Sequence, residues 1–96
     1  MEIAFKDKKL GEMVVDQKRL VRALGSRRAE LLLLRLSQMV SARNTEVLKT
    51  SRGHYHALTG DRKGQWACNL DQPYRLIFIV EENTIIIQEI IDYHGV

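Results

Sequence analysis

Three segments rich in β-branched and aromatic residues lie close together near the end of the chain, and they constrain the fold most. They span residues 65–70, 74–80 and 84–94, and their composition favours extended strands. The links between them, "DQP" and "EEN", are three residues long. Strands joined by such short links run antiparallel, because a parallel crossover needs about a dozen residues or more. The sequence therefore predicts a three-strand antiparallel meander.

The residues before this meander favour helices. "EIAF" at 2–5 is a short strand candidate, and Asp7 can cap a helix that follows it. Asp16 can cap the next helix, "QKRLVRAL", which Gly25 ends. Ser26 is the expected N-cap of the longest helix. Its apolar stripe has helical spacing and consists of Ala29, Leu32, Leu33, Leu36, Met39 and Val40.

The order of these segments predicts one α+β domain over residues 1–96. It consists of a short N-terminal strand, two to three helices and then the meander, with the helices packed on one face of the sheet. The stretch "ARNTEVLKTSRG" at 42–53 resembles a turn-rich connection. No repeat or linker divides the chain.

The composition is that of an ordinary soluble protein. The hydrophobic share is 45% and the charged share is 28%, as in typical globular domains. No apolar run approaches the roughly 20 residues of a membrane span, and "MEIAFKDKK" lacks the apolar stretch of a signal peptide. Cys68 is the single cysteine and has no neighbours at metal-ligand spacing. We therefore expect a cytoplasmic protein with no membrane partner, no metal and no cofactor.

Positive charge is concentrated before the meander. Residues 1–63 hold 14 of the 15 Lys and Arg but 7 of the 12 Asp and Glu, a net charge of +7, whereas the remainder carries −4. A basic surface attracts polyanions, of which nucleic acid is the commonest. The alternative is a set of solvated helix faces. Arg75 is the one base after Lys63.

The last predicted strand ends in three groups that can move protons, Asp92, Tyr93 and His94. Side chains alternate along a strand, so Asp92 and His94 should face one way, about 7 Å apart, and Tyr93 the other. Simpler interpretations exist for each group. The histidine could be a solvated terminal residue, Asp92 a charge that protects a sheet edge, and Arg75 the partner of a nearby acid.

A second polar cluster lies in "HYHALTGDRKGQW" at 54–66. Gly60 and Gly64 bracket a tight basic turn there, and His56 lies near its start. Together with Arg75 and the terminal cluster, this loop supplies what phosphodiester cleavage requires. The requirements are a group that activates the nucleophile, a group that protonates the leaving oxygen, and fixed positive charge beside the phosphorus.

These segments carry a family resemblance. "HALTGDRKGQWACNLDQPYRLIFIV" followed by "IIIQEIIDYH" resembles the RelE/ParE toxin superfamily, specifically its HigB-like branch of proteic killer proteins. The similarity covers about residues 25–94. It implies a compact microbial-ribonuclease-like α+β fold and a bacterial type II toxin that enters the ribosomal A site and cuts translated mRNA. It also implies metal-independent attack by the ribose 2′-OH, and a helix-turn-helix, HigA-like antitoxin as partner.

The resemblance implies catalytic roles residue by residue. His56 and His94 would form the acid/base pair, with their order left open. Arg75 would stabilise charge on the phosphate, and Asp92 would orient an imidazole or act as a base. Tyr93 would brace the site or stack a base. The residues expected to hold RNA phosphates are Arg62, Lys63, Arg27 and Arg28.

Two positions depart from the family pattern. Thr59 stands where a lysine is frequent, and Asp71 stands where some members have a base. Losing these positive groups could reduce activity. The main alternative function is a non-enzymatic ParE-like toxin that binds and inhibits DNA gyrase. Such a binder does not need the histidine, aspartate, tyrosine and arginine cluster.

Overall fold

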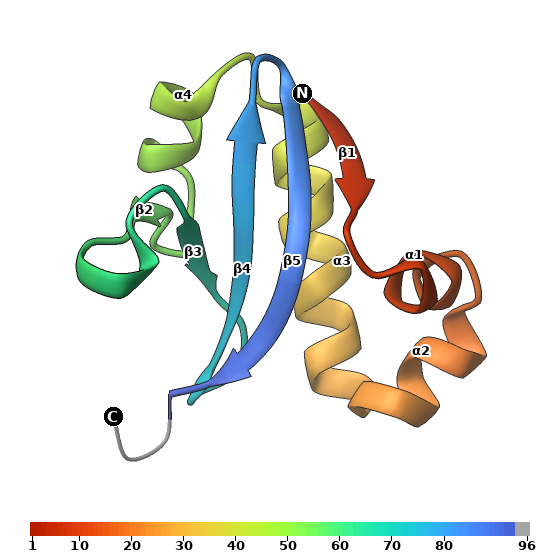
Figure 1. Ribbon diagram of the computed structural model, residues 1–96. Helices are drawn as coiled ribbons and strands as arrows, with labels where there is room; N and C mark the ends of the chain where they lie inside the picture. Colours follow the sequence, from red (N-terminus) through yellow and green to blue (C-terminus); the bar gives the residue numbers. More distant parts are fainter. Residues whose placement is uncertain (94–96) are drawn as a thin grey trace.

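The computed structural model describes residues 1–93, which include a five-stranded sheet of order β1-β5-β4-β3-β2. The strands are β1 (Glu2–Phe5), β2 (His56–Ala57), β3 (Trp66–Asn69), β4 (Tyr74–Glu81) and β5 (Thr84–Asp92). β2, β3, β4 and β5 pair antiparallel in sequence order, and β1 joins the other edge parallel to β5 (Figure 1). The predicted meander and N-terminal strand are confirmed. The end of the predicted last strand, with His94, lies outside the described residues.

Four α-helices lie between β1 and β2 in the described chain. They are α1 (Lys8–Val14), α2 (Gln17–Leu24), α3 (Ser26–Ser41) and α4 (Thr45–Thr50). Both predicted aspartate caps are confirmed, because the side chain of Asp7 accepts from the Lys9 amide at 2.9 Å and that of Asp16 from the Arg19 amide at 3.2 Å. The predicted Ser26 cap is wrong. Gly25 ends α2 and is itself the N-cap of α3, so Ser26 is already helical and makes no side-chain cap bond.

The prediction of a turn-rich connection at 42–53 is also wrong in part, because α4 forms there. The side chain of Asn44 caps α4 by accepting from the Val47 amide at 3.1 Å. Glu46 lies in the first turn of α4, where negative charge suits the helix dipole. Leu48 is fully buried in the core. Only one buried position marks this helix, so apolar periodicity could not reveal it.

The core lies between α3 and one face of the sheet, with α3 behind β5 in Figure 1. This arrangement confirms the predicted layers. Its main contacts are apolar: Ala29, Leu32, Leu36 and Met39 from α3, and Leu76, Phe78, Ile85 and Ile87 from the sheet. The other two residues of the predicted apolar stripe are not buried in the core, because Leu33 is half-buried and Val40 is exposed. Arg35, outside the predicted stripe, is 7% exposed.

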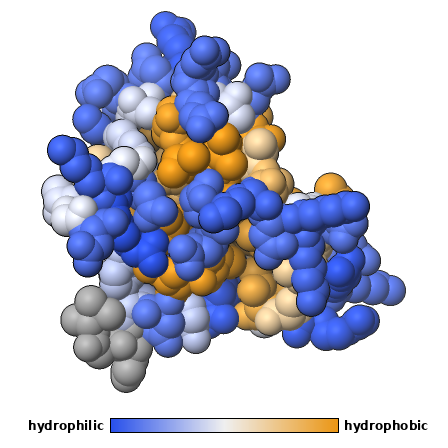
Figure 2. All heavy atoms as spheres, viewed as in Figure 1, coloured by the Kyte–Doolittle hydropathy of each residue, from blue (hydrophilic) through white to orange (hydrophobic). Residues whose placement is uncertain are grey.

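The other face of the sheet, which points toward the reader in Figure 1, is here called the open face. Alternation and strand register place Ile77, Ile79, Ile86 and Ile91 on it. Figure 2 shows this face with apolar residues along its middle and hydrophilic residues on both sides. Within residues 1–93, none of the helices is long and apolar enough to cross a membrane.

Candidate active site

Strand register brings His56 and Arg75 to the open face. His56 pairs with Ala67, Ala67 pairs with Ile77, and paired residues share a face. Arg75 lies two residues before Ile77 on β4, so its side chain points the same way. His56 and Arg75 come from strands with β3 between them, about 10 Å apart across the sheet by the usual strand spacing.

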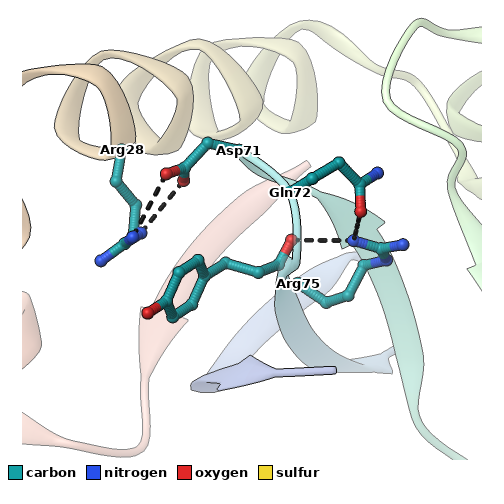
Figure 3. Close-up of polar contacts among 5 residues, drawn as sticks. Arg28, Asp71, Gln72 and Arg75 are labelled. Carbon is teal, nitrogen blue, oxygen red and sulfur yellow. Dashed lines mark hydrogen bonds and ion pairs between the residues drawn. The ribbon is translucent and has the colours of Figure 1, made fainter. Parts of the chain in front are cut away.

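The guanidinium of Arg75 is held by neutral oxygens. Its Nη1 donates to Oε1 of Gln72 at 3.2 Å and to the carbonyl oxygen of Tyr74 at 3.1 Å (Figure 3). The Tyr93 ring centre lies 5.4 Å from Cζ of Arg75, within range of a cation–π interaction. Among the described residues, Arg75 forms no ion pair with a carboxylate. Within residues 1–93, no carboxylate therefore neutralises this positive charge.

His56 is fixed in one tautomer by its own loop. Its Nδ1 lies 2.8 Å from the carbonyl oxygen of His54. A carbonyl oxygen only accepts hydrogen bonds, so Nδ1 must carry the proton. In the neutral ring, Nε2 then keeps a lone pair that can accept a proton. The His54 ring lies against that of His56, with 4.2 Å between the ring centres.

The segment that carries His56 is anchored to α3. Arg35 donates from Nε to the carbonyl oxygen of Asn69 at 2.6 Å, and the amide of Asn69 donates to the Gly53 carbonyl at 2.7 Å. A Cβ at Gly53, where φ is +116°, would come within 2.7 Å of Nε of Arg35. The hydroxyl of Tyr55 donates to Oε1 of Gln38, also on α3, at 2.7 Å. The backbone before His56 is thereby set by a buried arginine that the sequence analysis did not identify.

The glycine-bracketed loop lies beside Tyr93. Gly60 and Gly64 have φ values of +65° and +96°, which confirms the predicted tight turn. Arg62 donates to Oε1 of Gln65 at 2.9 Å and to Oε2 of Glu89 at 3.4 Å. A hollow of about 340 Å³ separates the loop from Tyr93. It is lined by Leu58, Thr59, Asp61, Arg62 and Tyr93.

The terminal cluster is divided by the strand. Asp92 pairs with Tyr74 and therefore belongs to the face opposite that of Arg75. Tyr93 lies beside Arg75, as its ring distance shows. This agrees with the prediction that Asp92 and Tyr93 point to different faces. His94 lies outside the described residues. The structure thus brings His56, Arg75 and Tyr93 to the open face and places Asp92 on the opposite face.

The four residues predicted to hold RNA differ in their surroundings. Arg27 and Lys63 are exposed, and Arg62 is half-buried. Arg28 is engaged elsewhere: its Nε and Nη2 bond the two carboxylate oxygens of Asp71 at 3.0 and 3.2 Å (Figure 3). This pair was not predicted from the sequence. Its one visible signal was the carboxylate at position 71, where the family resemblance leads us to expect a base in some members.

Other reactive groups are buried away from the open face. Burial raises the pKa of the Cys68 thiol to about 12, and burial likewise raises the pKa of the Tyr55 phenol. Both groups stay protonated at neutral pH, so neither offers an ionised nucleophile. Within residues 1–93, no three His, Cys, Asp or Glu side chains are grouped so that they could hold a metal ion.

A family model described as the HigB-like, RelE-like toxin of type II toxin–antitoxin systems matches residues 3–94. The chain belongs to this HigB-like toxin family. The resemblance in the loop and last strands is thereby confirmed. A comparison with curated proteins found no significant match.

Solved structures show the same fold for this HigB-like toxin. The YoeB–YefM complex from Staphylococcus aureus matches with a TM-score of 0.67 and 18% identity, over 98% of this chain and 97% of the other. A heterotetrameric YoeB–YefM toxin–antitoxin complex from the same organism matches with a TM-score of 0.62 and 16% identity, over 93% and 92%. A conserved hypothetical protein from Helicobacter pylori reaches 0.53 with 15% identity, over 98% and 96%.

Proposed function

We propose that this HigB-like toxin is a ribosome-dependent mRNA endoribonuclease and that the open face is its active site. The observation that carries the proposal is the position of the Arg75 guanidinium. This group is a fixed cation on the open face, held by neutral oxygens and flanked by Tyr93 and His56. Attack on a phosphodiester adds negative charge at phosphorus, and a preorganised guanidinium stabilises that charge.

The nucleophile in this proposal is the ribose 2′-OH beside the scissile phosphate. Nε2 of His56 takes the proton from the 2′-OH, since the bond to His54 leaves its lone pair free in the neutral ring. The 2′-oxygen then bonds to phosphorus, and the bond to the 5′-oxygen breaks. That leaving oxygen takes a proton from a second acid, for which His94 is the candidate, because Asp92 belongs to the face opposite that of Arg75. The products are a 2′,3′-cyclic phosphate and a 5′-hydroxyl end.

The remaining polar groups of the open face serve RNA binding. The hollow beside Tyr93 can receive an unstacked base, which would stack on the phenol ring. Arg62, which lines the hollow and pairs with Glu89, and exposed Lys63 of the same loop can contact phosphates. Exposed Arg27, on α3, can contact phosphates outside the open face. Arg28 contributes less to RNA binding than the sequence suggested, because Asp71 already neutralises it.

The shape of this site supports the proposed dependence on the ribosome. The middle of the open face is apolar (Figure 2), and few polar groups there could hold RNA. Such a surface holds a flexible single strand poorly. A ribosome that fixes the mRNA in the A site removes that ordering cost and presents the phosphate to Arg75.

We also propose a cytoplasmic location and a helix-turn-helix, HigA-like antitoxin as partner. The two solved neighbours from S. aureus are toxin–antitoxin complexes.

The test is mRNA cleavage by the wild-type toxin in a reconstituted translation system, with ribosomes and without them. We expect cuts only on translated mRNA, 2′,3′-cyclic phosphate ends, and unchanged product ends when magnesium is replaced by a polyamine on pre-formed ribosomal complexes. If naked RNA were cleaved as fast as translated mRNA, the proposed dependence on the ribosome would be wrong. Growth arrest without any cleavage would favour inhibition of DNA gyrase instead.

A further inference from the structure

The turn between β3 and β4, residues 71–73, connects α3 to Arg75. We propose that Gln72 is a positioning residue for Arg75, and that the Arg28–Asp71 ion pair holds the turn that presents it. This inference rests on the proposed function of the open face, where Arg75 meets the scissile phosphate. Figure 3 shows both halves of the arrangement, the ion pair on one side of the turn and Arg75 on the other.

The ion pair fixes one side of the turn. Both carboxylate oxygens of Asp71 bond Arg28, at 3.0 and 3.2 Å, and the two side chains are 22% and 24% exposed. Cζ of Arg28 lies 3.4 Å from the ring centre of Tyr74, so the guanidinium also packs on that phenol. A planar fork bonded twice and packed on a ring has little freedom to rotate. The turn is therefore attached to α3 in one orientation.

Gln72 and the carbonyl oxygen of Tyr74 hold the other side, through Nη1 of Arg75. Both acceptors are neutral, so they orient the guanidinium without cancelling its charge. Only Nη1 is used in these two bonds, which leaves Nε and Nη2 as a fork that matches two phosphate oxygens. The same turn also accepts a bond from the Tyr93 amide at the Pro73 carbonyl, at 3.0 Å.

This arrangement explains how a carboxylate at position 71 can be compatible with the charge of Arg75. A carboxylate so close to Arg75 in sequence would weaken the site if it paired with Arg75. Arg28 binds Asp71 instead, and the residue that reaches Arg75 is the uncharged Gln72. The departure at position 71 thereby becomes part of the support for Arg75.

The experiment compares Gln72→Glu and Gln72→Ala with wild type in the ribosomal cleavage assay, with kcat and KM separated. Glutamate would neutralise Arg75, so we expect kcat to fall roughly 10-fold or more. Alanine leaves the charge but loosens the guanidinium, and we expect a fall of roughly 5-fold. KM should stay near the wild-type value in both. The matched control, Asn83→Asp, adds one negative charge in the turn at the other end of β4 and should retain wild-type kcat.

A second readout does not require activity. The side-chain Nε–H signal of Arg75 is followed by nuclear magnetic resonance in wild type, Gln72→Ala, Asp71→Asn and Asn83→Asp. In Gln72→Ala and Asp71→Asn we expect the Arg75 signal to shift and its proton to exchange faster with water. In the control, Asn83→Asp, we expect the wild-type signal. If wild type is active and Gln72→Glu has the same kcat, the inference is overturned. An unchanged Arg75 signal in Gln72→Ala would also overturn it. A wild-type toxin that cuts no mRNA would instead overturn the proposed function, and the resonance data would still decide the role of Gln72.

Discussion

Arg35 and Arg75 lie on opposite faces of the sheet and show how the molecule uses its arginines differently. Arg35, on the face covered by α3, is buried and bonds the Asn69 carbonyl at 2.6 Å. Arg75, directly opposite Asn69 in the β3–β4 register, lies on the open face with two bonds to neutral oxygens. The covered arginine ties the fold together, whereas the open one bonds only neutral oxygens among the described residues. We therefore expect substitutions on the covered face to lower the free energy of unfolding, and substitutions on the open face to lower the cleavage rate.

The largest expected effect is on the open face, at His56. His56→Gln retains a donor for the His54 carbonyl but has no group that accepts a proton. We expect the cleavage rate on programmed ribosomes to fall by about 10² to 10⁴, the usual contribution of a general base. The thermal midpoint should stay within a few degrees of wild type. His54→Asn is the matched control, since asparagine tolerates the φ of +53° found there. Equal loss in both variants would assign the effect to loop structure.

On the covered face, Arg35→Met should show the reverse pattern. Methionine fills part of the space but leaves the Asn69 carbonyl without its donor, which we expect to cost about 1–3 kcal/mol of unfolding free energy. Urea unfolding measures this, and Arg43→Met, at an exposed position after α3, is the control. A wild-type midpoint in Arg35→Met would mean that Arg35 does not hold β3.

Gly53 tests the same anchor from the other side. Gly53→Ala forces a side chain into a left-handed backbone and against Arg35, where 2.7 Å separates the new Cβ from Nε. We expect a loss of about 1–2 kcal/mol, measured by urea unfolding. Combining it with Arg35→Met should cost less than the sum, because the clash then disappears. Strict additivity would argue against the contact.

The smallest effect concerns Cys68, buried in the core on the side of the sheet that α3 covers. Burial raises its pKa from 9.0 to about 12, so only the unfolded thiol ionises as pH rises above 9.0. Stability linked to this group is complete below that pH and declines as pH rises toward 12, by at most about 1.4 kcal/mol per pH unit. Urea midpoints between about pH 8 and 10 should therefore fall more steeply in wild type than in Cys68→Ala. Parallel slopes would show that the thiol ionises in the folded protein.

The parts of the fold that local sequence controls could be predicted. Alternating apolar residues with three-residue links gave the meander, and the caps at Asp7 and Asp16 gave the starts of two helices. α4 could not be predicted from periodicity, because a helix of six residues contributes one buried side chain, Leu48. The burial of Arg35 depends on a carbonyl group 34 residues away, which no local pattern reports.

The candidate site was predictable as a set of residues but not as a geometry. A one-residue slip of register would exchange the faces of β5, so only the pairing of Tyr74 with Asp92 separates Asp92 from Arg75. Likewise, four basic residues were predicted to bind RNA, yet the contact between Arg28 and Asp71 spans 43 residues. Sequence shows which charges exist, and tertiary contacts decide which of them remain available.

The most direct test of the difference between the two faces is the single-turnover cleavage rate of Arg75→Ala beside Arg35→Met on the same programmed ribosomes. The temperature is chosen so that circular dichroism shows both variants folded. We predict that Arg75→Ala loses about 10²-fold or more in rate with a wild-type unfolding midpoint, whereas folded Arg35→Met keeps a rate within about tenfold of wild type. If Arg75→Ala cleaves mRNA as fast as wild type, the open face is not the active site.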